Sequence, residues 1–332
     1  MKSSVSIVIP VHNERLNLPQ LIERCVKVGR ALDRPWELIL IDDGSRDGSS
    51  EMLVEAAKTY PGEIKSLILN RNYGQHNAIL CGFANAQGDV MVTLDADLQN
   101  PPEEIPKLLA AIDDGYDVVG SVRADRQDVF ARKLFSGIIN SIVRRSTGVQ
   151  MHDYGCMLRA YKRRVVDAML QCRERSTFIP VLANLFAKRV TEISVSHAAR
   201  AAGDSNYSVI KLVNLQFDLL TCMTAGPLRL LTWVGGGISA LAIGFALMLF
   251  FLRVVLGSEW AGNGVFTLFS ILFFFVGAQF VALGLMGEYV GRIHADVRER
   301  PRYILDNVVG ETLAEVPSQG LVGNATPART MA

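Results

Sequence analysis

Two aspartates separated by one residue follow a short apolar run in the N-terminal half of the chain. The run is Val90–Leu94, and Asp95 and Asp97 come directly after it. Side chains alternate between the two faces of an extended strand, so this spacing puts both carboxylates on one side. Carboxylate oxygens are preferred ligands of Mg²⁺ and Mn²⁺, which also bridge phosphates. We therefore predict a divalent metal site at Asp95 and Asp97, with Gln99 as a further oxygen ligand.

A second acidic pair, Asp42 and Asp43, opens a Gly-Ser turn after another apolar run. One interpretation is structural, with Ser45 or Asp47 capping the helix that follows the turn. The other is functional, with the carboxylates hydrogen-bonded to the base or ribose of a bound nucleotide. The two roles are compatible, and the residue types alone do not choose between them.

Three arginines are candidates for phosphate binding, because a guanidinium offers a rigid fork of donors to phosphate oxygens. They are Arg123, Arg132 and Arg200. Arg200 precedes a polar loop, Gly203–Tyr207, that leads into an apolar segment. That position would let Arg200 reach a lipid phosphate at a membrane surface. Solvated surface arginines are the alternative, above all for Arg132.

One further acid, Asp153, lies outside the strand pattern, in the sequence His-Asp-Tyr-Gly-Cys. With a hydroxyl as acceptor, Asp153 would be the natural general base. A phosphate acceptor already carries an ionised oxygen near neutral pH, so no proton has to be removed. We therefore expect Asp153 to position a donor sugar or a neighbouring arginine, with the general base as the alternative.

The candidate residues have to be positioned by the elements that precede them. Apolar runs alternate with segments of helical spacing up to about Arg123, and polar clusters follow the first four runs. This alternation predicts a mostly parallel sheet covered on both faces, with its ligand crevice at the carboxyl ends of the strands. The expected strands are Val5–Pro10, Glu37–Ile41, Ile64–Leu69, Val90–Leu94 and Val118–Val122, and the expected helices are Leu18–Leu32, Gly48–Tyr60, Gln75–Ala86 and Glu103–Asp114.

Two long segments in the second half of the chain carry no charged residue, from Leu230 to Leu252 and from Trp260 to Gly287. At about 1.5 Å per residue, each is long enough to cross a hydrocarbon core about 30 Å thick. We interpret them as a transmembrane hairpin, with a pair of buried core helices as the alternative. The connection Gly257–Gly264 has no Lys or Arg, whereas four arginines follow the second segment. The positive-inside rule therefore places both termini in the cytoplasm.

The chain divides into four parts by this pattern. Residues 1–207 form an α/β domain, whose amphipathic helix at 130–145 either faces the core or lies in the lipid interface. Residues 208–229 form an interfacial helix that leads into the hairpin at 230–288. Residues 289–332 form a cytoplasmic basic segment with a flexible tail.

Composition argues against a disulfide framework and against a nucleic-acid partner. The five cysteines are scattered and odd in number, which indicates reduced thiols in a cytosolic domain and no disulfide framework. The net charge of +1 gives no support for a nucleic-acid partner, and we expect none.

Together these motifs resemble the family-2 glycosyltransferases of GT-A fold, in the branch that uses polyprenyl phosphates. The likeness covers about residues 5–305 and is carried by Ile41–Ser45, Asn70–His76, Leu94–Pro106, Asp153–Arg159 and Arg175–Pro180. It implies a Rossmann-like catalytic domain, joined through interfacial helices to a two-helix transmembrane hairpin. It also implies a bacterial inner-membrane protein and a homo-oligomer, a tetramer.

The reaction implied by the resemblance is an inverting transfer of 4-deoxy-4-formamido-L-arabinose. The donor would be the UDP-sugar and the acceptor undecaprenyl phosphate, for lipid A modification and polymyxin resistance. Mg²⁺ or Mn²⁺ would bind at Asp95, Asp97 and Gln99. The catalytic residues would be Asp97, Arg123 and Asp153. The residues binding the nucleotide and phosphates would be Pro10, Glu14, Asp42, Asp43, Asn72, Asp95, Arg132, Ser136, Arg200 and Ser205.

Other functions stay open on the residues alone. Glucose or mannose could be the sugar transferred to the polyprenyl phosphate. A membrane-anchored nucleotide-binding scaffold would need nucleotide contacts but not both metal-placed acids. A processive polysaccharide synthase would need more spans and a Gln-x-x-Arg-Trp signature, which the sequence does not contain.

Overall fold

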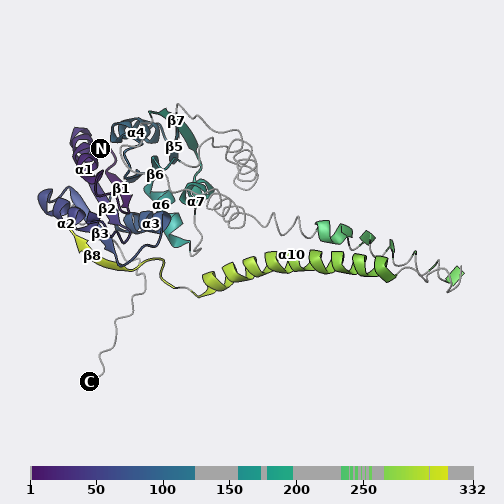
Figure 1. Ribbon diagram of the computed structural model, residues 1–332. Helices are drawn as coiled ribbons and strands as arrows, with labels where there is room; N and C mark the ends of the chain where they lie inside the picture. The colour runs from purple at the N-terminus through teal and green to yellow at the C-terminus, as the bar shows by residue number, and fades with distance from the viewer. Residues whose placement is uncertain are drawn as a thin grey trace, which may run out of the picture.

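The fold comes from a computed structural model that describes residues 2–123, 156–172, 178–196, 265–298 and 300–312, with further helical residues between 233 and 255. Its main body is an α/β domain, from which one long helix, α10 (Val265–Val297), projects (Figure 1). The candidate site residues that the structure describes lie in the α/β domain, and α10 extends away from it.

A single mixed sheet forms the centre of the domain. Its strands are β1 (Val5–Val11), β2 (Trp36–Asp42), β3 (Ile64–Leu69), β4 (Val90–Thr93), β5 (Val118–Arg123), β6 (Arg159–Lys162), β7 (Val190–Val195) and β8 (Leu305–Val309). Their spatial order is β7-β5-β6-β4-β1-β2-β3-β8. The central strands β4, β1, β2 and β3 are parallel, and β5 pairs parallel with β7. Strands β6 and β8 run antiparallel to their neighbours, so the predicted mostly parallel sheet is confirmed.

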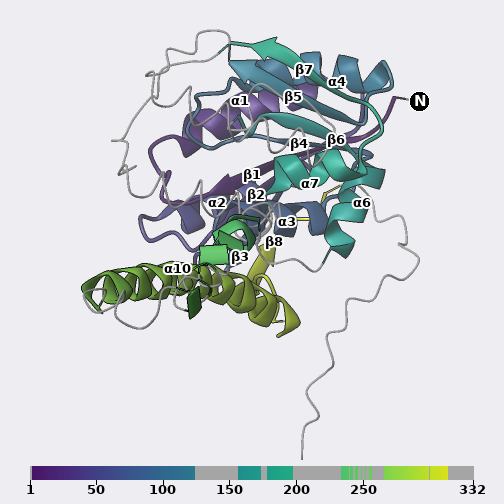
Figure 2. The ribbon, with the colours of Figure 1, turned by 90° about the vertical axis from the view of Figure 1, so that its right-hand side faces the viewer.

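Helices cover both faces of this sheet, as predicted. They are α1 (Leu18–Ala31), α2 (Ser49–Thr59), α3 (Gln75–Asn85), η1 (Pro102–Glu104), α4 (Ile105–Asp113), α6 (Arg163–Gln171) and α7 (Ile179–Phe186). Figure 2 shows α1 and α4 on one side of the sheet and α3, α6 and α7 on the other. Along β1, Ile7 and Ile9 pack into one hydrophobic cluster and Val8 into the other. The near-continuous apolar runs of the central strands follow from this burial on both faces.

The predicted elements of the first 123 residues are all present, with each end within two residues of the expected position. Three strands were not predicted. Strand β6 has only four residues and includes the fully buried Arg159, so neither its length nor its composition indicates a strand. Strand β7 is mostly half-exposed and β8 mostly exposed, so neither has the continuous apolar run of a central strand.

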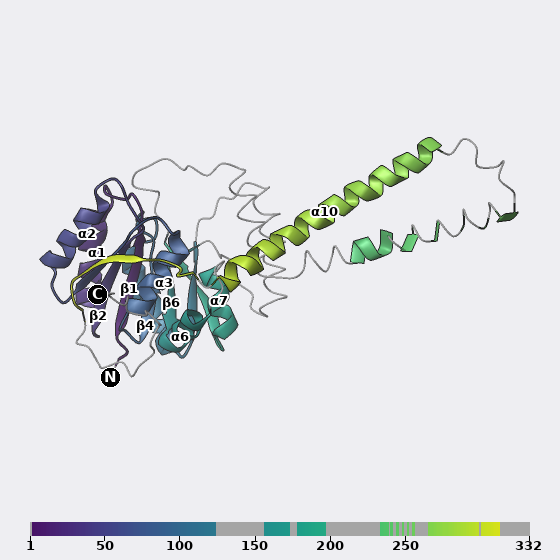
Figure 3. The same cartoon turned by 90° about the horizontal axis from the view of Figure 1, so that it is seen from below.

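The described part of the C-terminal segment differs from the expected basic segment with a flexible tail. After α10 the chain returns to the α/β domain, and β8 pairs antiparallel with β3 (Figure 3). Thr312 is buried, and its hydroxyl donates a hydrogen bond to the carboxylate of Glu37. Backbone hydrogen bonds to β3 attach this segment to the α/β domain. The five residues of β8 do not reveal that pairing in their sequence.

Helix α10 contains an apolar window, Phe274–Gly291, with a mean hydropathy of 1.3 and none of its residues buried. It is the one described helix with the length and composition to cross a membrane, and it coincides with most of the second predicted span. Of the first predicted span the structure describes separate helical residues, and their large apolar side chains, such as Trp233 and Leu241, are exposed. The helices expected at 130–145 and 208–229 lie outside the described residues.

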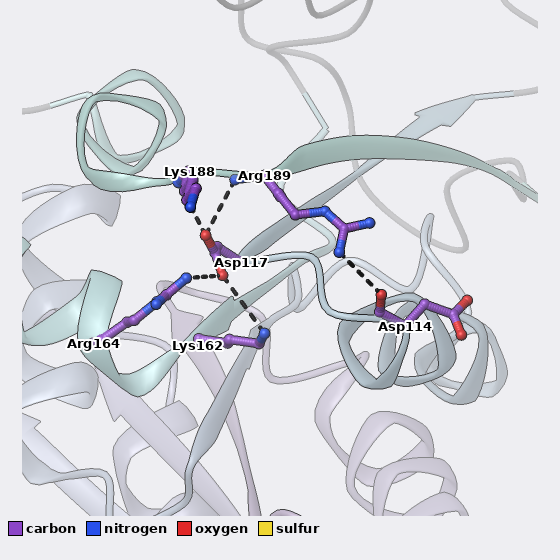
Figure 4. Close-up of polar contacts among 6 residues, drawn as sticks. All are labelled: Asp114, Asp117, Lys162, Arg164, Lys188 and Arg189. Carbon is purple, nitrogen blue, oxygen red and sulfur yellow. Dashed lines mark hydrogen bonds and ion pairs between the residues drawn. The ribbon is translucent and has the colours of Figure 1, made fainter.

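A buried acid, Asp117, joins β5 to the segments around it (Figure 4). Its carboxylate accepts backbone N–H groups of Lys188 at 2.9 Å and Arg189 at 3.1 Å. It also accepts the guanidinium of Arg164 and lies 3.5 Å from the ammonium of Lys162. Burial alone would raise the pKa of Asp117, but the hydrogen bonds from Arg164, Arg189 and Lys188 outweigh it and lower the pKa.

We expect Asp117→Asn to lower the free energy of unfolding by about 3 kcal/mol at neutral pH, because an amide cannot accept all of these donors. Because folding lowers the pKa of Asp117, the charged carboxylate stabilises the wild-type fold fully at pH values above the ordinary pKa of an aspartate. The advantage should disappear as pH falls through the folded-state pKa. Urea unfolding of the full chain in detergent at a series of pH values measures it.

The matched control for this variant is Asp114→Asn, whose exposed side chain lies in the same turn while its backbone carbonyl accepts Arg189 at 3.4 Å. It should change the free energy of unfolding by less than about 0.5 kcal/mol. A penalty for Asp117→Asn that stays constant down to low pH would contradict the role of the charged carboxylate.

Candidate active site

Apart from Arg123 at the end of β5, the predicted site residues that the structure describes lie at the carboxyl ends of four adjacent parallel strands. The register pairs Val11 of β1 with Asp42 of β2, and Asp42 with Ile68 of β3. On the other side of β1, Val8 pairs with Thr93, the last residue of β4. The loops that follow β1, β2, β3 and β4 therefore meet at one edge of the sheet, where the sequence placed the ligand crevice.

Asp43 connects three of these loops. Its side chain is 3% exposed, and its carboxylate accepts the backbone N–H groups of Tyr73 at 2.7 Å and Gly74 at 2.9 Å. Its backbone N–H donates to the carbonyl of Val11 at 2.8 Å, and its carbonyl oxygen lies 2.9 Å from Nδ1 of His12. Burial raises the pKa of Asp43, and the two N–H donors partly offset that rise. The carboxylate thus fixes the loop between β3 and α3 against the end of β2.

Gly44 makes this close approach sterically possible. Its φ of 68° lies in the left-handed region, and a Cβ atom there would stand 2.4 Å from the carbonyl carbon of Arg71 and 2.5 Å from the nitrogen of Asn72. No side chain fits between the two loops at that distance. In the Asp-Asp-Gly sequence, the buried carboxylate of Asp43 is the acceptor, and the absence of a side chain at Gly44 lets the loop that carries its donors approach.

The neighbouring Asp42 is 1% exposed and holds its own turn. Its carboxylate accepts the N–H of Ser45 at 3.2 Å and the hydroxyl of Ser50. Asp47 in turn accepts the N–H of Ser49, the first residue of α2, at 3.0 Å. The N-cap residue of α2 is Gly48, so Asp47 binds the first N–H of the helix from the position before the N-cap, while a contact of Asp42 or Asp43 with a nucleotide stays a prediction.

Asp95 and Asp97 lie just beyond β4, which ends at Thr93, so they belong to a loop and not to the strand. Burial nevertheless alternates as predicted. Asp95, Asp97 and Gln99 are half-buried, whereas the residues between and after them are at most 5% exposed: Ala96, Leu98 and Asn100. The alternation continues through a turn in which Leu98 adopts a positive φ of 60°, and Asp97 accepts the N–H of Gln99 at 3.1 Å.

The donor set at this loop fits Mg²⁺ or Mn²⁺. Mg²⁺ keeps several waters and binds proteins through one or two carboxylates together with substrate phosphates. Two half-buried carboxylates at a ligand-binding edge meet that requirement. Within the described residues, no three His, Cys, Asp or Glu side chains form a complete metal cage. The site therefore suits a cation that arrives with a phosphate ligand.

The remaining predicted residues divide between this edge and undescribed segments. Pro10 lies near the end of β1, Glu14 accepts the side-chain amide of Asn17 at 2.6 Å, and Asn72 accepts the N–H of Gly74 at 3.1 Å. The backbone of Arg123 ends β5. The residues outside the described part of the chain are Arg132, Ser136, Asp153, Arg200 and Ser205.

Sequence reasoning did not single out the residues that begin α3. The side-chain amide of Gln75 donates to Oδ1 of Asp95 at 2.7 Å. The next residue, His76, meets the ring of Phe178 edge-on, with ring centroids 5.1 Å apart. Burial lowers the pKa of His76 to about 4, so its imidazole is neutral at physiological pH. Both residues belong to the Asn70–His76 stretch. The likeness of that stretch to the family was the signal in the sequence that could have pointed to them.

Comparison with known proteins shows the family to which the chain belongs. Residues 6–170 match the family described as glycosyl transferase family 2. An undecaprenyl-phosphate 4-deoxy-4-formamido-L-arabinose transferase of Proteus mirabilis (strain HI4320) is 58% identical over 308 residues, which cover 93% of this chain and 94% of the relative. The transferase of the same description from Yersinia enterocolitica serotype O:8 / biotype 1B (strain NCTC 13174 / 8081) is 58% identical over 311 residues, 94% of this chain and 95% of the relative.

Among solved structures, the mannosyl-3-phosphoglycerate synthase of Rubrobacter xylanophilus is similar in fold. The TM-score is 0.50 with 13% sequence identity, over 68% of this chain and 74% of that chain. At this identity the likeness concerns the arrangement of the α/β domain and nothing finer.

We expect Gly44→Ala to weaken UDP binding by about 10-fold or more, equivalent to about 1.4 kcal/mol. The added Cβ would push the Arg71–Asn72 backbone away from β2 and break the hydrogen bonds at Asp43. Isothermal titration of UDP into the full chain measures the affinity.

Gly62→Ala is the matched control, because Gly62 also has a positive φ, 80°, but meets nothing within 4 Å of its Cβ position. Both variants carry the left-handed strain of about 1–2 kcal/mol, and only Gly44→Ala carries the clash. Equal UDP affinity in the two variants would show that the contact between these loops does not shape the nucleotide site.

Proposed function

Because this chain belongs to glycosyl transferase family 2 and, within it, to the undecaprenyl-phosphate 4-deoxy-4-formamido-L-arabinose transferases, we propose that it transfers this formamido-arabinose from UDP to undecaprenyl phosphate. The protein is a glycosyltransferase with a GT-A-type α/β domain. The observation that carries the proposal is 58% identity over nearly the full length of both chains. The acidic, half-buried edge of the parallel strands supports it.

The chemistry requires one bond to form and one to break. An oxygen of the lipid phosphate attacks the anomeric carbon from the side opposite the diphosphate, and the bond from that carbon to UDP breaks with inversion. A divalent cation, when bound by Asp95 and Asp97, supplies positive charge against the negative charge that builds up on the departing diphosphate. Gln99 is the proposed further ligand of that cation.

The protein's own part is to bind and orient the substrates. The loops held by Asp43 form the wall of the nucleotide site, with Pro10, Glu14, Asp42 and Asn72 as neighbouring contacts. Cationic side chains would stabilise the phosphates: Arg123, Arg132 and Arg200, with Ser136 and Ser205 as further donors. Asp153 would orient the sugar or an arginine, because an ionised phosphate acceptor needs no general base.

The acceptor is a membrane lipid, so the domain has to work at a membrane surface. Helix α10 supports this location, since it is long and apolar enough to span a bilayer and projects away from the domain. We propose two spans in a bacterial inner membrane, with both termini and the catalytic domain in the cytoplasm, and a tetrameric assembly. The product would serve lipid A modification and polymyxin resistance.

The sugar is tested most directly by product mass. Full-length protein in detergent, given undecaprenyl phosphate and a panel of UDP-sugars, should form the lipid-linked 4-deoxy-4-formamido-arabinose product. Faster transfer of glucose or mannose would replace the proposed donor by the alternative one. UDP binding without any lipid product from any donor would instead support a scaffold.

We expect Asp97→Asn to reduce transfer by at least about 100-fold, because even side chains one step removed from a metal ligand cost about 10- to 100-fold when changed. UDP release with undecaprenyl phosphate as acceptor measures the rate. The control is Asp33→Asn, an exposed acid that pairs with Lys2 at 3.1 Å on the surface. Metal-dependent turnover of Asp97→Asn close to wild type would remove this residue from the metal site.

A further inference from the structure

The hydrogen bond between Gln75 and Asp95 links two separate elements of the site. Nε2 of Gln75, the first residue of α3, donates to Oδ1 of Asp95, in the loop after β4, at 2.7 Å. This distance falls in the short range of hydrogen bonds with a charged partner. The two residues are 20 positions apart, so the contact is not a feature of a local turn.

The backbone that leads to Gln75 is fixed. The N–H of Gly74 donates to Oδ2 of Asp43 at 2.9 Å, and Gly74 adopts a φ of 90° that turns the chain into α3. The side-chain amide of Asn77 donates to the carbonyl of Tyr73 at 2.8 Å. The amide of Gln75 therefore extends from a point that is held by the buried carboxylate of Asp43.

The two acids of the proposed metal site are oriented in different ways. Asp97 accepts the N–H of Gln99, two residues later, and so is held within its own turn. Asp95 accepts a hydrogen bond from a residue of α3, a separate element of the site. The terminal torsion of an aspartate is broad, so a carboxylate on a loop needs a donor to select one orientation.

The residue type suits this task. A carboxylate has two oxygens with about four acceptor positions, and a single amide N–H occupies one of them. A glutamine amide is neutral and orients the carboxylate without cancelling its charge. A lysine or arginine at position 75 would pair with Asp95 and compete with the metal.

We infer that Gln75 is a positioning residue that orients the carboxylate of Asp95 toward a divalent cation bound with the UDP moiety. The inference rests on the proposed metal site at Asp95 and Asp97. It adds a residue of α3 that acts on the cation only through Asp95.

The test measures Mn²⁺ binding to full-length protein in detergent with saturating UDP. The electron paramagnetic resonance signal of free Mn²⁺ gives the dissociation constant. Gln75→Met keeps the side-chain length and removes the donor. Its dissociation constant for Mn²⁺ should rise by about 10- to 100-fold, the usual cost of losing a partner of a metal ligand. The Mn²⁺ concentration for half-maximal transfer should rise by the same factor, while kcat at saturating Mn²⁺ stays within a few-fold of wild type.

Gln20→Met is the matched control, because Gln20 is an exposed glutamine in the first turn of α1. It should leave both Mn²⁺ affinity and activity unchanged, and equal thermal midpoints without metal would show that all variants fold. Asp95→Asn is the reference for loss of a ligand and should weaken Mn²⁺ binding more than Gln75→Met.

The outcomes separate this inference from the proposed function. If Asp95→Asn loses Mn²⁺ affinity but Gln75→Met binds Mn²⁺ like wild type, the inference is wrong and the metal site stands. If Asp95→Asn itself binds Mn²⁺ like wild type, the metal site is wrong and the role of Gln75 fails with it. A lower kcat for Gln75→Met with unchanged Mn²⁺ affinity would also overturn the inference, since it would indicate direct contact with substrate.

Discussion

The burial of the Asp43 carboxylate is the constraint on which the site depends. An acid removed from water has to be given hydrogen-bond donors, and the backbone N–H groups of Tyr73 and Gly74 supply them. Those donors can reach it only if the loop after β3 crosses to the end of β2, which the missing side chain of Gly44 allows. The start of α3, and with it the donor to Asp95, is set by the same contact.

The C-terminal segment holds the other end of that loop. The N–H of Asn70 donates to the carbonyl of Ile304 at 3.2 Å, β8 then runs along β3, and the buried Thr312 forms a bridge with Gly62. Helix α10 ends at Val297, so only a short stretch of chain lies between this long apolar helix and the hydrogen bond of Ile304 to the loop after β3. This attachment connects the edge strand beside β3 directly to the end of α10.

The α/β domain was predictable where each segment carries its own signal. Strands buried on both faces have to be continuously apolar, and the surface helices have to be amphipathic, so β1 to β5 and α1 to α4 follow from the pattern. Strand β6 was not predictable, because it contains a charged residue, Arg159, that is nevertheless fully buried. Nε of Arg159 donates a hydrogen bond of 2.8 Å to the carbonyl of Cys156. Nothing in four residues of sequence indicates that such a partner is available.

By itself, the sequence determined which chemistry the site can support and on which edge of the sheet the site lies. Acidic pairs after apolar runs imply metal and nucleotide binding, and parallel strands bring their carboxyl ends together whatever the details of the loops. Only the tertiary structure decided what each acid does. Asp42 and Asp43 accept hydrogen bonds that hold their loops, Gln75 donates to Asp95, and β8 forms an edge strand beside β3. Those roles depend on contacts between residues far apart in the chain, and the spacing of residue types does not encode such distances.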